Sequence, residues 1–189
     1  MKLRASAGIL AASALLALSL APLSMAGDEA ASAPGTLGFK ASNKMYSADG
    51  KFEKWHFTKI DIPDGDLEKG TAEFEVDLAS VWEKADALAE HLRQADFFDV
   101  AKFATATVKI HGVTKTGDDT YDATATIDFH GHTGDVPVSF KVVSESPLKI
   151  EGSATMQRTA FGIGGEHDPS NERSITDDVA ITLEATLEH

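Results

Sequence analysis

The amino-acid sequence predicts an all-β fold with one short helix. Apolar and polar residues alternate over most of the chain, as expected for antiparallel strands that have one dry face and one wet face. About eight such runs are present, the number of strands that closes a barrel around one small ligand. Only one segment has apolar residues at helical spacing. A two-sheet sandwich predicts nearly the same pattern, so periodicity alone leaves barrel and sandwich open.

The alternation is clearest in five runs. Along residues 71–78 the apolar residues Ala72, Phe74, Val76 and Leu78 alternate with threonine and acidic residues. A pattern of period two places these side chains on one face of a strand. The apolar residues of the other four runs are Tyr121, Ala123, Ala125, Ile127 and Phe129; Val136, Val138, Phe140 and Val142; Leu148, Ile150, Ala154 and Met156; and Val179, Ile181, Leu183, Ala185 and Leu187.

Three further strands are expected at residues 37–46, 51–62 and 104–111. In the second of these the apolar phase slips between Phe57 and Ile60, and a bulge near Thr58-Lys59 reconciles the two registers. Hairpin turns are predicted at Ala48-Asp49-Gly50 and at Gly117-Asp118-Asp119, because glycine and aspartate favour tight turns.

The single helix is predicted at residues 81–95. Ala85, Leu88 and Leu92 recur at helical spacing, with charged residues on the other faces. Ser80 is a suitable N-cap residue, although no capping box follows it. We expect the helix to cover the side or the end of the barrel.

The N-terminus resembles a cleaved secretory signal peptide over residues 1–26. Lys2 and Arg4 precede the apolar run 9–20, which is short for a membrane span, and Ser24-Met25-Ala26 fits a small-x-small cleavage site. Residues 27–35 are predicted to be a flexible lead-in, rich in small and acidic residues. These features predict a periplasmic or secreted protein with no stable membrane anchor.

The charge and the residue content of the chain argue against several classes of function. The formal net charge of −13 becomes −15 once the two positive charges of Lys2 and Arg4 are removed, and such acidity argues against nucleic acid as a partner. There is no cysteine, so neither a disulfide framework nor a cysteine nucleophile is available. No G-x-S-x-G elbow and no phosphate loop in a strand–helix setting is present. The sequence therefore predicts a protein that is not an enzyme.

One segment carries a family pattern. Residues 91–103 read H-L-R-Q-A-D-F-F-D-V-A-K-F, which resembles the hallmark H-L-x-x-x-D-F-F-D-V-x-K-[YF] of the YceI-like lipid/polyisoprenoid-binding family. The resemblance implies that residues 36–189 form an elongated, lipocalin-like, eight-stranded antiparallel β-barrel that holds one long apolar molecule. It thereby favours the barrel over the sandwich. Polyisoprenoid, quinone-like or acyl lipids are the implied ligands, and no other cofactor is expected.

The predicted inner wall is built of small residues and aromatics. Without a guest such a wall either flattens into a self-filled core or encloses a cavity, because native interiors leave few large voids. The sequence leaves both outcomes open, whereas the resemblance favours an apolar tunnel. The alanines are Ala41, Ala72, Ala106, Ala123, Ala125, Ala154 and Ala185, and the aromatics are Phe39, Phe57, Phe74, Phe129 and Phe140.

Arg158 is the one charged residue in phase with the dry face after Met156. It begins Arg158-Thr159-Ala160-Phe161-Gly162, which resembles the family's R-x-x-F-G motif. Its guanidinium could anchor the polar head of a ligand, or it could form a structural ion pair or cap backbone carbonyls. Phe97 and Phe98 present a similar choice between ligand contact and core packing. The predicted ligand-binding residues are Phe97, Phe98, Phe129, Phe140, Met156, Arg158 and Phe161.

Two alternatives from other function classes stay open. His130 and His132, together with Glu166-His167-Asp168, could make a metal site in a small exported metal-binding or stress-protective protein. Against this, the alternation places His130 outward on its strand, and nothing in the sequence brings His167 near it. An exposed sheet edge could instead bind a partner protein, and a homodimer is compatible with the sequence.

Overall fold

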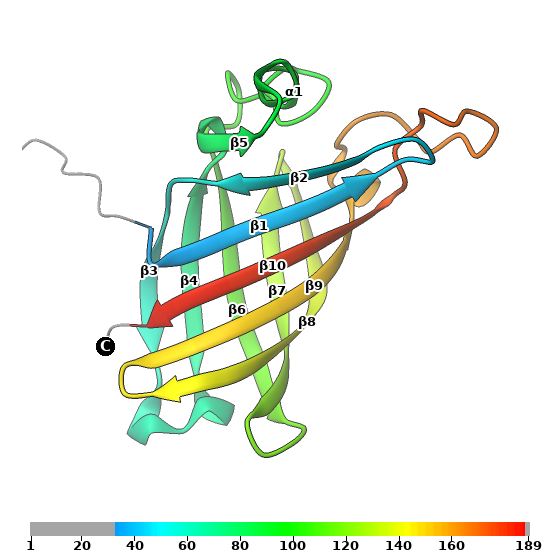
Figure 1. Ribbon diagram of the computed structural model, residues 1–189. Helices are drawn as coiled ribbons and strands as arrows, with labels where there is room; N and C mark the ends of the chain where they lie inside the picture. The colour runs from blue at the N-terminus through cyan, green and yellow to red at the C-terminus, as the bar shows by residue number, and fades with distance from the viewer. Residues whose placement is uncertain (1–32, 188–189) are drawn as a thin grey trace, which may run out of the picture.

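The protein is built on one curled antiparallel sheet. The computed structural model describes residues 33–187. Its ten strands are hydrogen-bonded in the order β3-β4-β6-β7-β8-β9-β10-β1-β2-β5, and Figure 1 shows the sheet wrapping around a central space with α1 at one end. The strands are β1 (Gly35–Ser42), β2 (Ser47–Phe52), β3 (Trp55–Asp61), β4 (Thr71–Asp77), β5 (Val81–Glu83), β6 (Thr105–Lys115), β7 (Thr120–Phe129), β8 (His132–Glu145), β9 (Leu148–Gln157) and β10 (Asp178–Leu187); the helices are η1 (Pro63–Gly65), η2 (Leu67–Lys69), η3 (Leu78–Ser80), α1 (Asp86–Leu92) and η4 (Arg158–Phe161).

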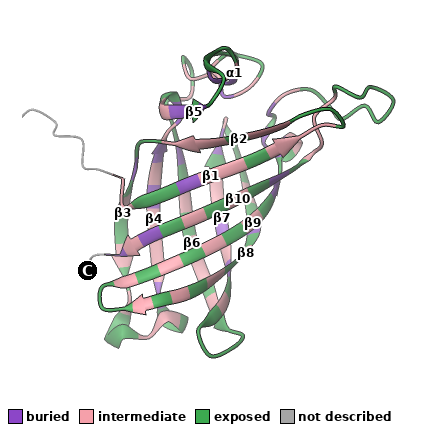
Figure 2. Ribbon diagram, viewed as in Figure 1, coloured by how far each residue is buried: buried purple, intermediate pink, exposed green. Residues whose placement is uncertain are grey.

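The two-residue period of the sequence sets the inner and outer faces of this sheet. Exposed and more deeply buried residues alternate along β9 and β10, as the bands in Figure 2 show. Every neighbouring pair of strands is antiparallel. The described residues therefore form a single curled sheet, and the alternative of two packed sheets is wrong.

The predicted count of eight strands differs from the ten observed, because two strands bend around a corner. The run predicted at 51–62 is divided between β2 and β3 at Glu53-Lys54, and β4 continues through η3 into the additional strand β5. The two corners are joined by hydrogen bonds from Glu53 N to Ser80 O (3.1 Å) and from Asp77 N to Lys54 O (3.0 Å). This bent pair links the two ends of the sheet. The predicted bulge is confirmed, since the register shifts between Phe57 and Lys59.

The first hairpin turn lies earlier than predicted. Ala48, Asp49 and Gly50 belong to β2, where they pair with Ala41, Lys40 and Phe39. The turn is made instead by residues 43–46, in which Asn43 Oδ1 accepts the backbone N–H groups of Met45 and Tyr46, both at 2.8 Å. Gly50 leaves room for the Phe39 side chain, because a Cβ at this position would lie 2.2 Å from the Phe39 ring. The predicted turn at residues 117–119 does connect β6 to β7.

The helix is shorter than the predicted 81–95. Val81 and Glu83 belong to β5, where they pair with Phe52 and Gly50 of β2, so the helix begins only at Asp86. Ser80 does not cap it, because its hydroxyl donates to Asp77 O (2.6 Å) and accepts from Lys54 N (3.0 Å) at the corner of the sheet. Because residues 81–83 pair with β2, the first residues of the predicted helix form a strand instead.

The histidine-bearing turn between β7 and β8 is also tighter than predicted. Phe129 pairs with His132, leaving the two-residue turn His130-Gly131 with φ of 54° and 77°. Positive φ at both positions is typical of a type I′ hairpin turn. His130 therefore lies in the turn and not outward on a strand, and β8 begins at His132 rather than at the predicted Val136.

The predicted signal peptide, residues 1–26, lies outside the described residues, as does most of the predicted lead-in. At the end of that lead-in, Gly35 already pairs with Ala185 in β1. A Cβ at Gly35 would lie 1.8 Å from Glu184 O, so only glycine allows this close approach to β10. Within residues 33–187, no helix has the length and apolar character needed to cross a bilayer.

Candidate functional site

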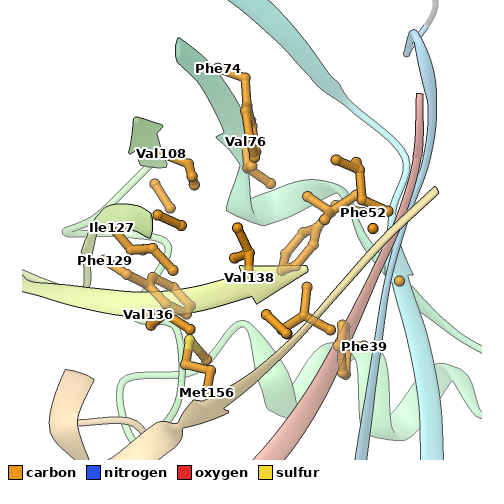
Figure 3. Close-up of a pocket in the computed structure, with 18 of the residues that line it drawn as sticks. Phe39, Phe52, Phe74, Val76, Val108, Ile127, Phe129, Val136, Val138 and Met156 are labelled. Atoms are coloured by element: carbon orange, nitrogen blue, oxygen red, sulfur yellow. The ribbon is translucent and has the colours of Figure 1, made fainter. Parts of the chain in front are cut away.

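The curled sheet encloses an apolar cavity of about 270 Å³. Side chains from opposite walls point into the same space in Figure 3, with Phe39 and Phe52 on one side and Ile127 and Phe129 on the other. The lining reaches from η4 and α1 at one end to η2 at the other. Among the described residues that line it, the only charged side chain is Arg158. A flattened, self-filled interior is therefore wrong for this chain.

The small residues of the dry face make this space. Five of the seven predicted wall alanines line the cavity, whereas Ala123 and Ala185 are buried in the surrounding core. Cavities cost about 24 cal/mol per Å³ in proteins, so an unfilled space of this size represents on the order of 6 kcal/mol. The lining alanines are Ala41, Ala72, Ala106, Ala125 and Ala154.

Phe98 joins the two walls of the cavity. Its ring centroid lies 5.7 Å from Phe52 and 5.4 Å from Phe129, and 6.5 Å from Phe39. The side chain is buried, and it also lines the cavity. Phe98 is therefore packed in the core, as one of the two predicted roles requires, and part of its surface also faces the cavity.

Of the other four predicted aromatic residues, three line the cavity and one does not. Phe97 lines the cavity and packs edge-on against His91 at 5.0 Å. Phe129 and Phe140 line it as well, and Phe140 stacks on Tyr121, its cross-strand partner in β7, at 5.1 Å. Phe161 is not among the lining residues. It is buried behind the wall, 6.3 Å from Phe129, where it packs against Gly134.

Met156 and Arg158 are both buried and both line the end of the cavity near η4. The guanidinium of Arg158 donates to four backbone carbonyls: Nε to Thr176 O (3.0 Å), Nη1 to Ile163 O (2.6 Å) and Gly165 O (2.7 Å), and Nη2 to Ile175 O (2.9 Å). These carbonyls come from both ends of the loop between η4 and β10. Arg158 therefore caps backbone carbonyls, one of its predicted roles, and holds this loop closed at its base.

A second contact fixes the same end of the loop. Asp177 accepts hydrogen bonds from Thr159 N (2.9 Å) and Thr159 Oγ1 (2.6 Å). The hydroxyl bond from Thr159 holds the pKa of the Asp177 carboxyl below its usual range, partial burial opposes this, and the nearby charge of Arg158 supports it. Gly162 ends η4 with φ of 68°, as expected for a glycine that reverses the chain.

Several lining residues were not predicted from the sequence. Phe52 lies before the corner of the sheet, out of phase with the Trp55 and Phe57 register that the alternation suggested. Ile163 and Ile175 lie in the loop after η4, where no periodicity identifies a buried side chain. Leu88 and Leu92 of α1 also line the cavity, and their helical spacing was the signal for them.

The histidines do not converge with other ligands. The rings of His130 and His132 lie 6.4 Å apart at the β7–β8 turn, next to Gly162. The predicted third member, His167, contacts Ile175 O through Nδ1 at 3.1 Å. Over residues 33–187, no three histidine, cysteine or carboxylate side chains are grouped so that they could hold a metal ion.

Comparison with known proteins shows the family to which this chain belongs. The model of the YceI-like domain family matches residues 29–187. A UPF0312 protein of Pseudomonas fluorescens (strain SBW25) is 32% identical over 158 residues, which cover 78% of this chain and 79% of that protein. A UPF0312 protein of Azotobacter vinelandii is 32% identical over 90 residues, which cover 44% of this chain and 47% of that protein, so this alignment spans about half of that relative.

Solved structures share the fold at lower identity. BcnA of Burkholderia cenocepacia aligns with a TM-score of 0.72 at 18% identity, covering 82% of this chain and 96% of that chain. A polyisoprenoid binding domain from Saccharophagus degradans, implicated in plant cell wall breakdown, aligns with a TM-score of 0.56 at 18% identity, covering 83% and 97% of the two chains. At these identities the likeness establishes the fold.

Proposed function

Because this chain belongs to the YceI-like domain family, we propose that it binds a long-chain lipid of the polyisoprenoid or quinone-like class in its central cavity. It acts as a carrier or sequestering protein and not as an enzyme. The observation that carries this proposal is the apolar cavity itself, lined from end to end by aliphatic and aromatic side chains. The polyisoprenoid binding domain of Saccharophagus degradans, which shares the fold, supports the ligand class.

The energetics of the cavity favour a long apolar chain. Burying one methylene group stabilises a complex by about 0.8 kcal/mol, so roughly ten groups approach the ~8 kcal/mol of a micromolar complex. Association and ordering costs reduce that sum, and a longer isoprenoid or acyl chain offsets them. The lining supplies apolar contacts along its whole length, which suits an extended ligand better than a compact one.

The ligand contacts proposed from the sequence follow the lining. Phe97, Phe98, Phe129, Phe140 and Met156 contact the lipid chain directly. Phe161 supports Phe129 from behind the wall and does not itself touch the ligand. Arg158 stands at one end of the chain. The signal-like segment 1–26 directs the protein to the periplasm or the medium, where such a carrier meets lipid outside the cytoplasm.

Native mass spectrometry tests the proposal. The protein is purified without detergent from cells that export it, and co-purified lipid is identified by its mass. We expect one long-chain isoprenoid-like lipid per chain, and expect the delipidated protein to take up an isoprenoid-tailed quinone. A protein that is always free of lipid and takes up no such quinone contradicts the proposal.

A further inference from the structure

The guanidinium of Arg158 keeps one N–H donor that the protein does not use. A guanidinium carries five N–H donors, one on Nε and two on each Nη. Nε and both donors of Nη1 are taken by Thr176, Gly165 and Ile163, whereas Nη2 donates only to Ile175 O. Within residues 33–187, the second N–H of Nη2 has no acceptor. Arg158 is 4% exposed and lines the cavity, so this donor is withheld from bulk water.

The positive charge of Arg158 is also not neutralised by an ion pair. No carboxylate of the described residues lies within salt-bridge distance of it. The neighbouring carboxylate of Asp177 is held by Thr159. Buried donors and charges cost free energy unless they find an acceptor. This end of the cavity therefore favours a ligand atom that accepts a hydrogen bond.

The other end of the cavity offers no comparable group. Near η2 the lining includes Ile62, Leu67 and Val113, and the polar side chain there is the uncharged hydroxyl of Thr71. The hydroxyl of Ser139, one of the few polar residues in the lining, donates to Asp122 Oδ1 at 2.7 Å. Figure 1 shows η2 and the end of the curled sheet that holds η4 at opposite ends of the molecule. Among the described lining residues, a charged donor is thus present at one end of the cavity only.

We infer that the cavity binds its lipid in one orientation, with an oxygen-bearing, uncharged or anionic head group that accepts a hydrogen bond from Nη2 of Arg158 and with the tail directed toward η2. This inference rests on the proposed function, and it adds which end of the lipid lies where and which head groups are selected. Pure hydrocarbons bind more weakly because they leave the donor unpaired, and cationic head groups are rejected by the guanidinium charge.

Matched ligands test the head-group preference on the unaltered protein. Heptadecane and 2-heptadecanone have the same chain, and only the ketone accepts a hydrogen bond. Each competes with N-phenyl-1-naphthylamine, a fluorescent apolar probe, for the delipidated protein. We expect the ketone to bind about tenfold more tightly, the effect of one hydrogen bond from a charged donor. An Arg173→Met variant, which removes an exposed positive charge outside the cavity lining, is the control and retains the preference.

The outcomes separate the two proposals. Equal displacement by both ligands overturns the inference about Arg158 while the proposed lipid binding stands. If neither ligand nor the isoprenoid-tailed quinone binds, the proposed function itself fails. Arg158→Lys is an additional variant, expected to lose the preference, but the conclusion does not depend on its folding because the ligand pair is compared on the unaltered protein.

Paramagnetic lipids test the orientation. 5-Doxyl-stearate carries its nitroxide near the carboxylate head and 16-doxyl-stearate carries it near the tail. We expect the first to broaden the amide NMR signal of Ile163, next to Arg158, and the second to broaden that of Leu67 in η2. The reverse pattern, or equal broadening of both signals by each label, overturns the single orientation.

Discussion

Thr159 donates both its backbone N–H, at 2.9 Å, and its hydroxyl, at 2.6 Å, to the same carboxylate oxygen of Asp177. This contact ties the first turn of η4 to the residue that precedes β10. The two segments are also joined by the hydrogen bond from Arg158 N to Asp177 O at 3.0 Å. The Asp177 carboxylate therefore holds the rim of the cavity near Arg158, and protonation of this carboxylate weakens its hydrogen bonds to Thr159.

Acid is expected to destabilise the protein through Asp177. Its pKa is lowered in the folded state, chiefly by the hydroxyl of Thr159, so the unfolded chain binds the proton more readily. The stabilisation is fully present above the ordinary aspartate pKa of about 3.9 and is lost as the pH falls through the lower folded value. Urea unfolding between pH 7 and pH 2.5 should show this loss, and Asp177→Asn should flatten it. Asp118→Asn, in the exposed β6–β7 turn, controls for removing one negative charge; an identical pH profile for both variants contradicts the assignment.

Replacing Arg158 is expected to weaken the fold as well as the binding site. Arg158→Met leaves four backbone carbonyls without their donor, and each unsatisfied buried acceptor costs about 1–3 kcal/mol. Because several of these carbonyls are partly reachable by water, we expect a total loss of roughly 3–5 kcal/mol in the free energy of unfolding. Denaturant titration measures it. Arg173→Met, in an exposed part of the same loop, should change stability by less than about 0.5 kcal/mol. Comparable losses in the two variants argue against the clamp.

Filling the cavity should abolish lipid uptake without unfolding the protein. Ala154 lines the cavity between Val138 and Ile181, and a phenylalanine there occupies space that the lipid needs. Ala154→Phe should raise or preserve the melting temperature and remove the lipid from the native mass spectrum. Ala180→Phe, on the exposed face of β10, is the matched control and should keep its lipid. Undiminished uptake by Ala154→Phe places the ligand elsewhere.

Removing the Phe98 ring should be costly because the ring connects both walls. Phe98→Ala loses contacts with Phe52 and Phe129 and enlarges an existing cavity, which costs about 3–5 kcal/mol in comparable cores. Phe98→Leu should lose less, since most of the volume stays. Thermal unfolding of the delipidated proteins measures both. If Phe98→Ala is as stable as the unaltered protein, the ring does not bridge the walls in solution.

Much of the fold follows from local pattern. The two-residue period located the strands and, at Phe57 and Lys59, even the bulge, because one slipped residue exchanges the dry and wet faces. The same period placed Met156, Phe129 and Phe140 on the inner wall. The helix boundary at Asp86 and the turn at residues 43–46 were not predictable, because each depends on a pairing partner distant in sequence.

The sequence by itself determined the strand class, the inward faces and the family of this protein, since these depend on periodicity and on one contiguous motif. Only the tertiary structure decided how the ends of the sheet join and that the alanine-rich wall encloses a cavity. It also decided that Arg158 donates four hydrogen bonds to backbone carbonyls and that Phe161 lies behind the cavity wall. The physical reason is that closure, cavity volume and donor count are set by contacts between segments far apart in the chain, and no local pattern encodes them.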